Sequence, residues 1–266
     1  MVDAAGEIRG YVLDREAGRG GHATVYRGHK AGEPDQPVAL KVLGADHRRP
    51  AELARLNREF EFAHRLSHPH IITVYEHGPF WLAMQFVDGG KSTHLQRVTD
   101  QLAALRQIAD ALDYVHGQGI VHGDVKPANI LVAKDFSRSG ACLIDFGVAH
   151  AVVDDVFRRP KDVQASLPYA APEVLCGRAP TAATDEYALA CSAVELLTGA
   201  PPFAADNSTE LVNAHLRGIP PRISHDVSWA SRAFDTVVAR AMARDSEVRY
   251  QSCTELVEHV TRAMDR

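Results

Sequence analysis

The sequence of 266 residues contains no long apolar run, and no stretch reaches the roughly 18 consecutive apolar residues that a membrane-spanning helix needs. Its first seven residues include two acids and lack the apolar segment of a secretion signal. We therefore expect no membrane segment and a cytoplasmic location.

The sequence also has few cysteines and no net positive charge. The four cysteines are far apart in the sequence and form no Cys-x-x-Cys pair, which favours free thiols in a reducing compartment. The formal net charge is −5, so there is no excess of lysine and arginine to attract a nucleic-acid backbone. We expect no nucleic-acid partner.

The first third of the chain is predicted to form an antiparallel sheet and one helix. Short β-branched and aromatic runs between turns predict strands at residues 11–13, 25–26, 38–43, 71–75 and 81–87, with Gly18–Gly21 as one of the turns. After Pro50, apolar residues recur at helical spacing, and Glu59 lies on their stripe. A carboxylate on a buried face needs a partner.

The rest of the chain is predicted to be mainly helical. One apolar stripe ends at Gly117–Gly119, residues 187–197 are apolar on nearly every side, and residues 229–264 predict two more helices. The length suits one two-lobed domain better than two independent domains. We therefore expect an α+β fold in a single domain over residues 1–266, with a small β-rich lobe (1–86) that carries one helix and a larger helical lobe (87–266).

A glycine-rich segment in the first lobe could bind phosphate. Gly18, Gly20 and Gly21 would let backbone amides approach polyphosphate oxygens without interference from a Cβ atom. The segment alone is weak evidence, because glycine-rich hairpins are common. The position of the segment strengthens the prediction that it binds phosphate, because the segment joins two predicted strands. Lys41 lies on the next strand, with Glu59 as a candidate ion-pair partner.

The segment from residue 119 to 130 reads Gly-Ile-Val-His-Gly-Asp-Val-Lys-Pro-Ala-Asn-Ile, and Asp145-Phe146-Gly147 follows. Asp124 could accept the proton of an attacking hydroxyl, and Lys126 could neutralise a phosphoryl group. Asn129 and Asp145 supply oxygen ligands for Mg²⁺. The alternative, a polar surface loop, does not explain why an apolar strand pattern follows Asn129 directly.

The order of these motifs, completed by Ala171-Pro172-Glu173, resembles that of the eukaryotic-like Ser/Thr protein kinases of bacteria. The resemblance runs from about Tyr11 to the C-terminus. It implies the bilobal protein kinase fold and a Mg²⁺- or Mn²⁺-dependent enzyme that transfers the γ-phosphate of ATP to Ser or Thr hydroxyls of a protein substrate. It also allows for a regulatory partner protein.

The resemblance also implies a role for particular side chains. The catalytic set is Lys41, Glu59, Asp124 and Lys126. The ATP-binding set is Gly18, Gly20, Gly21, His22, Val25, Ala39, Lys41, Met84, Gln85, Val87, Asn129, Leu131 and Asp145, of which Asn129 and Asp145 are the metal ligands. Glu173 is expected to pair with Arg249, and Asp185 to brace the catalytic loop.

Two residue types that the resembled family uses for regulation are missing. Gly123 stands where the family usually has arginine, which makes this chain a non-RD variant, and residues 147–165 contain no serine, threonine or tyrosine. A loop phosphate and that arginine are electrostatic partners, so their joint absence predicts activity without loop phosphorylation. The segment is then expected to be ordered either by packing, with the apolar residues Val152, Val153, Val156 and Phe157 as anchors, or by a partner protein. Ser166 replaces a threonine and keeps a hydroxyl that can bond Asp124 and Lys126.

Two other functions remain open alternatives. A pseudokinase scaffold is disfavoured because Lys41, Glu59, Asp124, Asn129 and Asp145 are all present. A small-molecule kinase of the same superfamily is disfavoured because residues 166–173 and the helical region after residue 202 resemble the peptide-docking half of protein kinases.

Overall fold

The computed structural model describes residues 7–151 and 164–265. These residues form two compact units. The smaller unit contains the chain up to Asp88 together with Asp145–Val148, and the larger unit contains Gly89–Ile144 and the chain from Ala149 onward. The apolar residues expected to anchor the segment before residue 165, Val152, Val153, Val156 and Phe157, lie outside the described residues.

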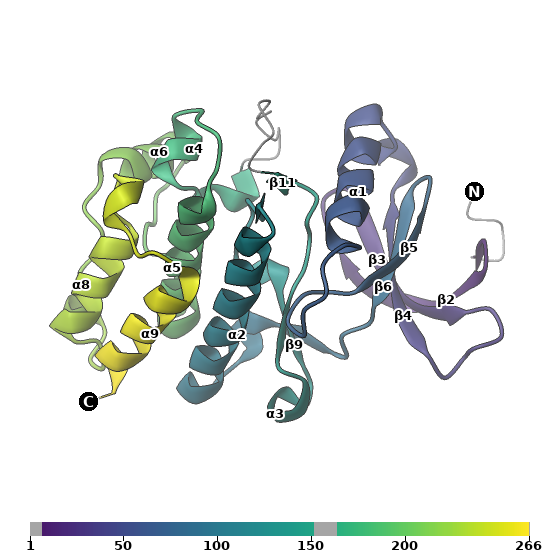
Figure 1. Cartoon of the computed structure of the whole chain (residues 1–266), viewed down its shortest axis with the longest axis horizontal. Helices are drawn as coiled ribbons and strands as arrows, with labels where there is room; N and C mark the ends of the chain where they lie inside the picture. Colours follow the sequence, from purple (N-terminus) through teal and green to yellow (C-terminus); the bar gives the residue numbers. More distant parts are fainter. Residues whose placement is uncertain (1–6, 152–163, 266) are drawn as a thin grey trace. The chain divides into compact units, whose positions relative to one another are not determined.

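The smaller unit is built on a six-stranded sheet in the order β1-β2-β3-β4-β6-β5, with every neighbouring pair antiparallel (Figure 1). The strands are β1 (Glu7–Ile8), β2 (Tyr11–Arg19), β3 (Ala23–Lys30), β4 (Pro37–Leu43), β5 (Val74–Gly78) and β6 (Trp81–Gln85). The predicted antiparallel sheet is confirmed. Its core includes Ile8, Tyr11, Leu40, Val42, Trp81 and Ala83.

Several predicted strand boundaries were wrong, and two of them bear on the site. Ile71 and Ile72 are buried, but they precede the strand, which begins only at Val74. The turn in the glycine segment is also shorter than predicted. Strand β2 continues through Gly18 and Arg19, because register shifts between Leu13 and Gly18 keep it paired with β3.

Helix α1 (Pro50–Ala63) lies in the smaller unit and contacts β5 and β6. It begins at Pro50, where the missing N–H of proline costs nothing. Leu56, Glu59 and Ala63 form its buried side, as the helical spacing predicted. A carboxylate therefore enters an otherwise apolar face and must be paired there.

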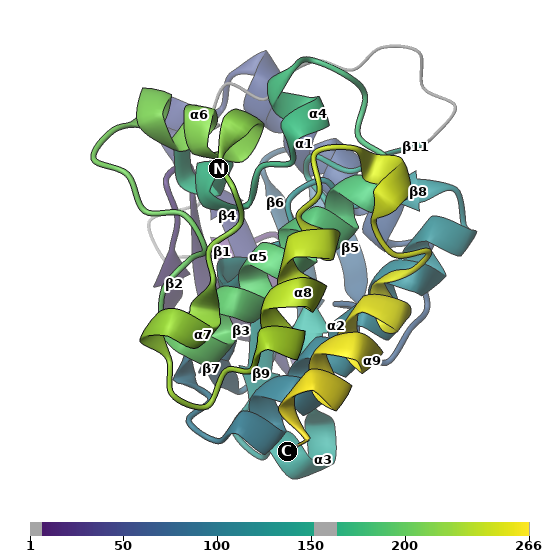
Figure 2. The same cartoon turned by 90° about the vertical axis from the view of Figure 1, so that its left-hand side faces the viewer.

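The larger unit is mainly helical, and Figure 2 shows its long helices running side by side. The helices are α2 (Val98–Gly117), α3 (Phe136–Ser139), α4 (Pro172–Leu175), α5 (Ala182–Thr198), α6 (Ser208–Arg217), α7 (Ile223–Asp226), α8 (Arg232–Ala241) and α9 (Cys253–Met264). Two small sheets, β10-β9-β7 and β11-β8, are formed by β7 (Gly89–Lys91), β8 (Ile120–Val121), β9 (Ile130–Ala133), β10 (Ala141–Leu143) and β11 (His150–Ala151).

Helix α5 is the centre of this unit and contacts α2, α8 and α9. It is buried on nearly all sides, as predicted, and it ends at Gly199, whose φ of 87° is the left-handed conformation that favours glycine. The two helices predicted for the C-terminal part are α8 and α9. Together with the sheet of the smaller unit, these helices confirm the α+β class. No helix in the described parts of the chain has the length and apolarity to cross a membrane.

A buried ion pair joins α4 to the segment before α9. The guanidinium of Arg249 donates two hydrogen bonds to Glu173, at 2.9 and 2.8 Å, and others to the carbonyl oxygens of Ala243 and Ala183. Burial alone would raise the pKa of Glu173, but the hydrogen bonds and charge of Arg249 lower it below its ordinary value. The predicted pairing of Glu173 with Arg249 is confirmed.

We expect Arg249→Ala to lower the free energy of unfolding by about 3–5 kcal/mol, because it leaves the buried Glu173 carboxylate without its partner. The matched control is Arg262→Ala, which removes an exposed pair with Glu258 and should cost less than about 1 kcal/mol. Urea unfolding of both variants measures the difference. Equal, small losses would show that the buried pair contributes little.

Candidate active site

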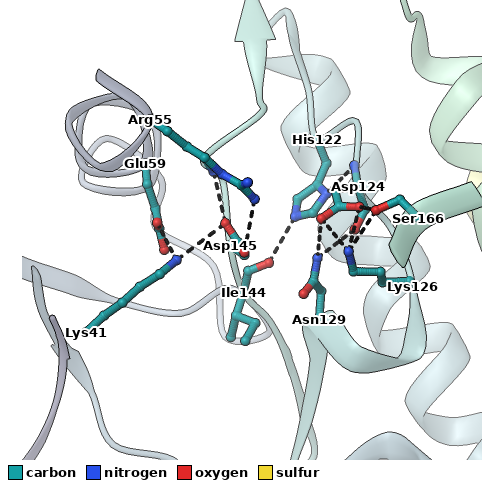
Figure 3. A network of polar contacts seen from close by, with 11 residues as sticks. Lys41, Arg55, Glu59, His122, Asp124, Lys126, Asn129, Ile144, Asp145 and Ser166 are labelled. Atoms are coloured by element: carbon teal, nitrogen blue, oxygen red, sulfur yellow. Dashed lines mark hydrogen bonds and ion pairs between the residues drawn. The ribbon is translucent and has the colours of Figure 1, made fainter. Parts of the chain in front are cut away.

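The candidate catalytic loop connects β8 to β9, and its polar side chains converge on Asp124 (Figure 3). Lys126 Nζ donates to the two carboxylate oxygens of Asp124 at 2.9 and 2.8 Å and to Ser166 Oγ at 2.9 Å. Ser166 Oγ donates to Asp124 Oδ1 at 2.5 Å. The expected contacts of Ser166 are confirmed, and they join the loop to a residue 42 positions away.

Asn129 completes this set. Its Nδ2 donates to the backbone oxygen and to Oδ2 of Asp124, at 2.8 and 3.0 Å. These bonds fix the amide plane and leave Oδ1 as the free acceptor. An amide oxygen is a ligand that Mg²⁺ accepts, so the orientation of Asn129 fits the metal role expected for it.

Asp185 of α5, whose side chain is completely buried, binds the backbone of the loop. Its carboxylate accepts hydrogen bonds from the backbone amides of His122 and Gly123, each at 2.8 Å, and lies 2.8 Å from His116 Nε2. Burial alone would raise the pKa of Asp185, but the hydrogen bond and charge of His116 lower it. The predicted brace is therefore confirmed as a contact.

His122 links the loop to the residue before Asp145. Its Nδ1 accepts the backbone N–H of Asp124 at 3.2 Å, so the proton lies on Nε2, which donates to the carbonyl oxygen of Ile144 at 3.1 Å. The backbone amide of Ile144 donates to the carbonyl oxygen of Asn129. The loop and the strand that leads to Asp145 are thus connected on both sides.

The second set of candidate residues lies in the smaller unit, around Lys41 and Asp145. Lys41 Nζ lies 2.6 Å from Glu59 Oε2 and 3.5 Å from Asp145 Oδ1, so the predicted pairing of Lys41 with Glu59 is confirmed. Burial alone would lower the pKa of Lys41, but the carboxylates of Asp145 and Glu59 raise it above its ordinary value. Lys41 therefore stays charged, as a phosphate-binding cation must.

Asp145 has a backbone φ of 67°, and it is the one non-glycine residue with positive φ among those that the structure describes. Such strain in a residue with a chemically active side chain is typical of functional sites. Its Oδ1 accepts the backbone N–H of Gly147 at 3.3 Å. Two hard carboxylate oxygens suit a divalent cation such as Mg²⁺.

Arg55 is a contact of Asp145 that the sequence reasoning missed. Its Nη2 lies 3.6 Å from Asp145 Oδ2 (Figure 3). The signal that could have found it is its spacing: Arg55 lies four residues before Glu59 on α1, and residues at this spacing share one face of a helix.

The glycine segment leaves its backbone open. A Cβ atom at Gly18 or Gly21 would meet no heavy atom within 4 Å, and neither glycine has a positive φ. The packing of the chain itself therefore does not require glycine at these positions. Gly20 closes the turn by donating to the carbonyl oxygen of Ala23 at 2.8 Å. This open backbone fits the predicted approach of phosphate oxygens.

The remaining ATP-binding candidates occupy paired positions. Val25 is opposite Lys41 across β3 and β4, and Ala39 is opposite Met84 across β4 and β6. Gln85 is the last residue of β6, and Val87 lies two residues further along the chain. The ring of His22 packs edge-on against that of His47. Leu131 lies in β9 of the larger unit. The sheet register therefore brings Val25, Ala39, Lys41 and Met84 together on neighbouring strands.

One other group of chemically active side chains has a structural use. Asp113, His116 and Cys253 offer possible metal ligands within 4.8 Å of one another. Both oxygens of Asp113, however, accept the first backbone amides of α9, and His116 contacts Asp185. These side chains stabilise the packing of α2, α5 and α9.

With this geometry established, comparison with known proteins assigns the family. A model of the protein kinase domain matches residues 11–261. The chain belongs to the protein kinase domain family, which in general uses ATP with a divalent metal ion. The α+β fold and the two sets of site residues agree with this assignment.

Several curated mycobacterial proteins are similar to the chain. Serine/threonine-protein kinase PknJ of Mycobacterium tuberculosis is 39% identical over 278 residues, which cover 99% of this chain and 47% of that protein. Serine/threonine-protein kinase PknF of the same species is 39% identical over 264 residues, covering 92% and 54%. Serine/threonine-protein kinase PknH of Mycobacterium bovis is 37% identical over 260 residues, covering 92% and 42%. The chain spans about half the length of the curated relatives it matches.

Gly123 has a conformational role in the loop. Its φ is 77°, in the left-handed region that favours glycine, and its N–H is committed to Asp185. We expect Gly123→Ala to lower the free energy of unfolding by about 1–2 kcal/mol, the cost of a Cβ atom in this region.

The matched control for Gly123→Ala is Gly117→Ala at the end of α2, where φ is not positive and a Cβ atom would meet nothing within 4 Å. This control should raise stability by up to about 1 kcal/mol, because alanine favours the helix. Thermal unfolding of both variants measures the contrast. A stabilising Gly123→Ala would contradict the conformational role.

Proposed function

We propose that this chain is an active Ser/Thr protein kinase domain that transfers the γ-phosphoryl group of ATP to Ser or Thr hydroxyls of proteins. The observation that carries the proposal is the Asp124 carboxylate, which is held by Lys126 and Asn129 of the same loop and by Ser166 from a segment 42 positions away. A base that must orient a hydroxyl needs this kind of fixed carboxylate. The names of the mycobacterial relatives support the choice of Ser and Thr.

In the proposed reaction, Asp124 accepts the proton of the substrate hydroxyl. The hydroxyl oxygen of the substrate attacks the γ-phosphorus of ATP at the same time. The bond from this phosphorus to the β,γ-bridging oxygen breaks, and ADP leaves. Lys126 neutralises charge on the phosphoryl group during transfer. Because Lys126 and Ser166 already contact Asp124, the hydroxyl of a substrate would join a network that exists before it binds.

Lys41 would bind the nucleotide phosphates, with Glu59 holding its ammonium in place. Gly18, Gly20 and Gly21 would place backbone amides along the phosphates. A bound Mg²⁺ or Mn²⁺, held by Asp145 and Asn129, would neutralise the phosphate oxygens. Val25, Ala39, Met84, Gln85, Val87 and Leu131 would contact the adenosine part, with His22 beside the glycines.

The alternatives fit the observations less well. A pseudokinase scaffold does not need the Lys41–Glu59 pair or the ordered network at Asp124. A small-molecule kinase does not need the stretch from Ser166 to Glu173, which here is tied at one end to the catalytic loop and at the other to Arg249.

We further propose that activity does not depend on phosphorylation of the segment before Ser166, as expected of a non-RD kinase. The described ends of this segment are held by packing and hydrogen bonds. Strand β11 pairs with β8, His150 Nε2 lies 3.2 Å from the carbonyl oxygen of Pro180, and Leu167 is buried. These contacts support order without a phosphate, and a regulatory partner protein could add to it.

Asp124→Asn tests the proposed chemistry directly. We expect transfer to fall by roughly 10²- to 10⁴-fold, because the general base is lost, while the affinity for ATP is retained. Asp145→Asn should instead abolish the part of nucleotide affinity that depends on Mg²⁺. A radiolabelled ATP assay with a generic protein substrate and calorimetry with ATP separate the two effects. Near-normal transfer by Asp124→Asn would refute the assignment of the base.

Exhaustive phosphatase treatment tests the proposed regulation. We expect the treated and untreated protein to have the same activity, because residues 147–165 contain no hydroxyl to phosphorylate. Mass spectrometry verifies complete dephosphorylation and should map any autophosphorylation to exposed residues such as Ser137, Ser139 or Thr209. A loss of activity on treatment that returns after incubation with ATP would contradict the proposal.

A further inference from the structure

The side chains of Lys41 and Arg55 both lie beside the carboxylate of Asp145. Lys41 Nζ lies 3.5 Å from Oδ1, and Arg55 Nη2 lies 3.6 Å from Oδ2 (Figure 3). Lys41 has a second partner in Glu59 and a role in the proposed function. The proposed function gives Arg55 no role, yet its guanidinium lies beside Oδ2 of Asp145.

The turn after Asp145 is shaped to admit Arg55. A Cβ atom at Gly147 would lie 2.8 Å from Cγ and from Nε of Arg55, so the absence of a side chain at Gly147 makes room for the arginine. About a third of the Arg55 side chain is exposed, which leaves it a path toward solvent. Arg55 is therefore packed closely against the turn while part of its side chain reaches solvent.

A guanidinium beside Asp145 conflicts with a divalent cation on the same carboxylate. A Mg²⁺ ion would bind an oxygen at about 2.1 Å and would then lie within a few ångströms of the positive charge of Arg55. Like charges at this separation repel, and the repulsion is strongest where water is partly excluded. Arg55 must move before the cation binds, or it must weaken the binding.

We propose that Arg55 is a gate on the metal site: its guanidinium takes the place of the divalent cation at Asp145 and is displaced when the cation binds with nucleotide. This inference rests on the proposed function, in which Asp145 is a metal ligand. Its consequence is that Arg55 raises the Mg²⁺ concentration at which the chain binds nucleotide. A partly exposed ion pair of this kind corresponds to a shift of roughly two- to fivefold.

The test is calorimetric titration of ADP at a series of Mg²⁺ concentrations, starting from EDTA, with the wild-type chain, Arg55→Gln and Arg58→Gln. Arg58 lies on the same helix and is exposed, so it controls for the loss of one positive charge on α1. We expect the Mg²⁺ midpoint of ADP affinity to fall roughly two- to fivefold in Arg55→Gln and to stay unchanged in Arg58→Gln. Circular dichroism verifies that each variant is folded.

A double-mutant cycle makes the inference specific to Asp145. In the Asp145→Asn background, Arg55→Gln should have no further effect on ADP affinity at any Mg²⁺ concentration, because the carboxylate for which Arg55 and the cation compete is absent. A midpoint that is unchanged or higher in Arg55→Gln would overturn the gate alone. ADP binding by the wild-type chain that is indifferent to Mg²⁺ would overturn both the gate and the metal role of Asp145.

Discussion

The catalytic loop depends on one buried carboxylate. Asp185 is completely buried on α5, and such a charge is stable only when donors surround it. Those donors are two backbone amides of the loop and the ring of His116. Because the amides belong to residues 122 and 123, the requirement to satisfy one charge fixes the backbone immediately before Asp124. The positions of Lys126 and Asn129 follow from that path.

The need of a buried carboxylate for donors also fixes Glu173, at the far end of the segment that follows Asp145. Glu173 is a second buried carboxylate, and its donors are Arg249 and Thr184. Ser166 lies between Asp145 and Glu173 in the sequence and is hydrogen-bonded to Asp124, the proposed base, and to Lys126. In kinases that are switched on by a loop phosphate, charge-assisted hydrogen bonds to that phosphate supply this order. Here the described contacts at Ser166 and Glu173 are hydrogen bonds and a buried ion pair, and Gly123 has a positive φ that favours glycine.

The polar chemistry is divided between the two units of the chain. The Lys41–Glu59 pair and Asp145 belong to the smaller unit, whereas Asp124, Lys126 and Asn129 belong to the larger one. Asp145–Val148 packs with the smaller unit although the chain on both sides of it belongs to the larger. Arg55 contacts Asp145 in this short segment. Helix α1 therefore contacts Asp145 directly through Arg55 and indirectly through Glu59, which pairs with Lys41.

Local patterns were sufficient to predict much of this protein. Short β-branched and aromatic runs between turns predicted the sheet, the stripe after Pro50 predicted α1, and the apolar run at residues 187–197 predicted the buried helix. The motif order predicted the candidate catalytic residues. These features are determined by sequence because each depends on residues that are close together in the chain. Strand ends were less predictable, since register shifts and the burial of Ile71 and Ile72 depend on neighbouring strands.

Tertiary structure decided what depends on distant residues or on backbone angles. The sequence indicated Arg249 as the partner of Glu173 only through a resemblance, because 76 positions separate the two residues. The positive φ of Asp145 and of Gly123 has no local sequence signature strong enough to predict it. The contact of Arg55 with Asp145 requires a helix and a turn 90 positions apart to meet, and only the packing of α1 against the rest of the smaller unit brings that about.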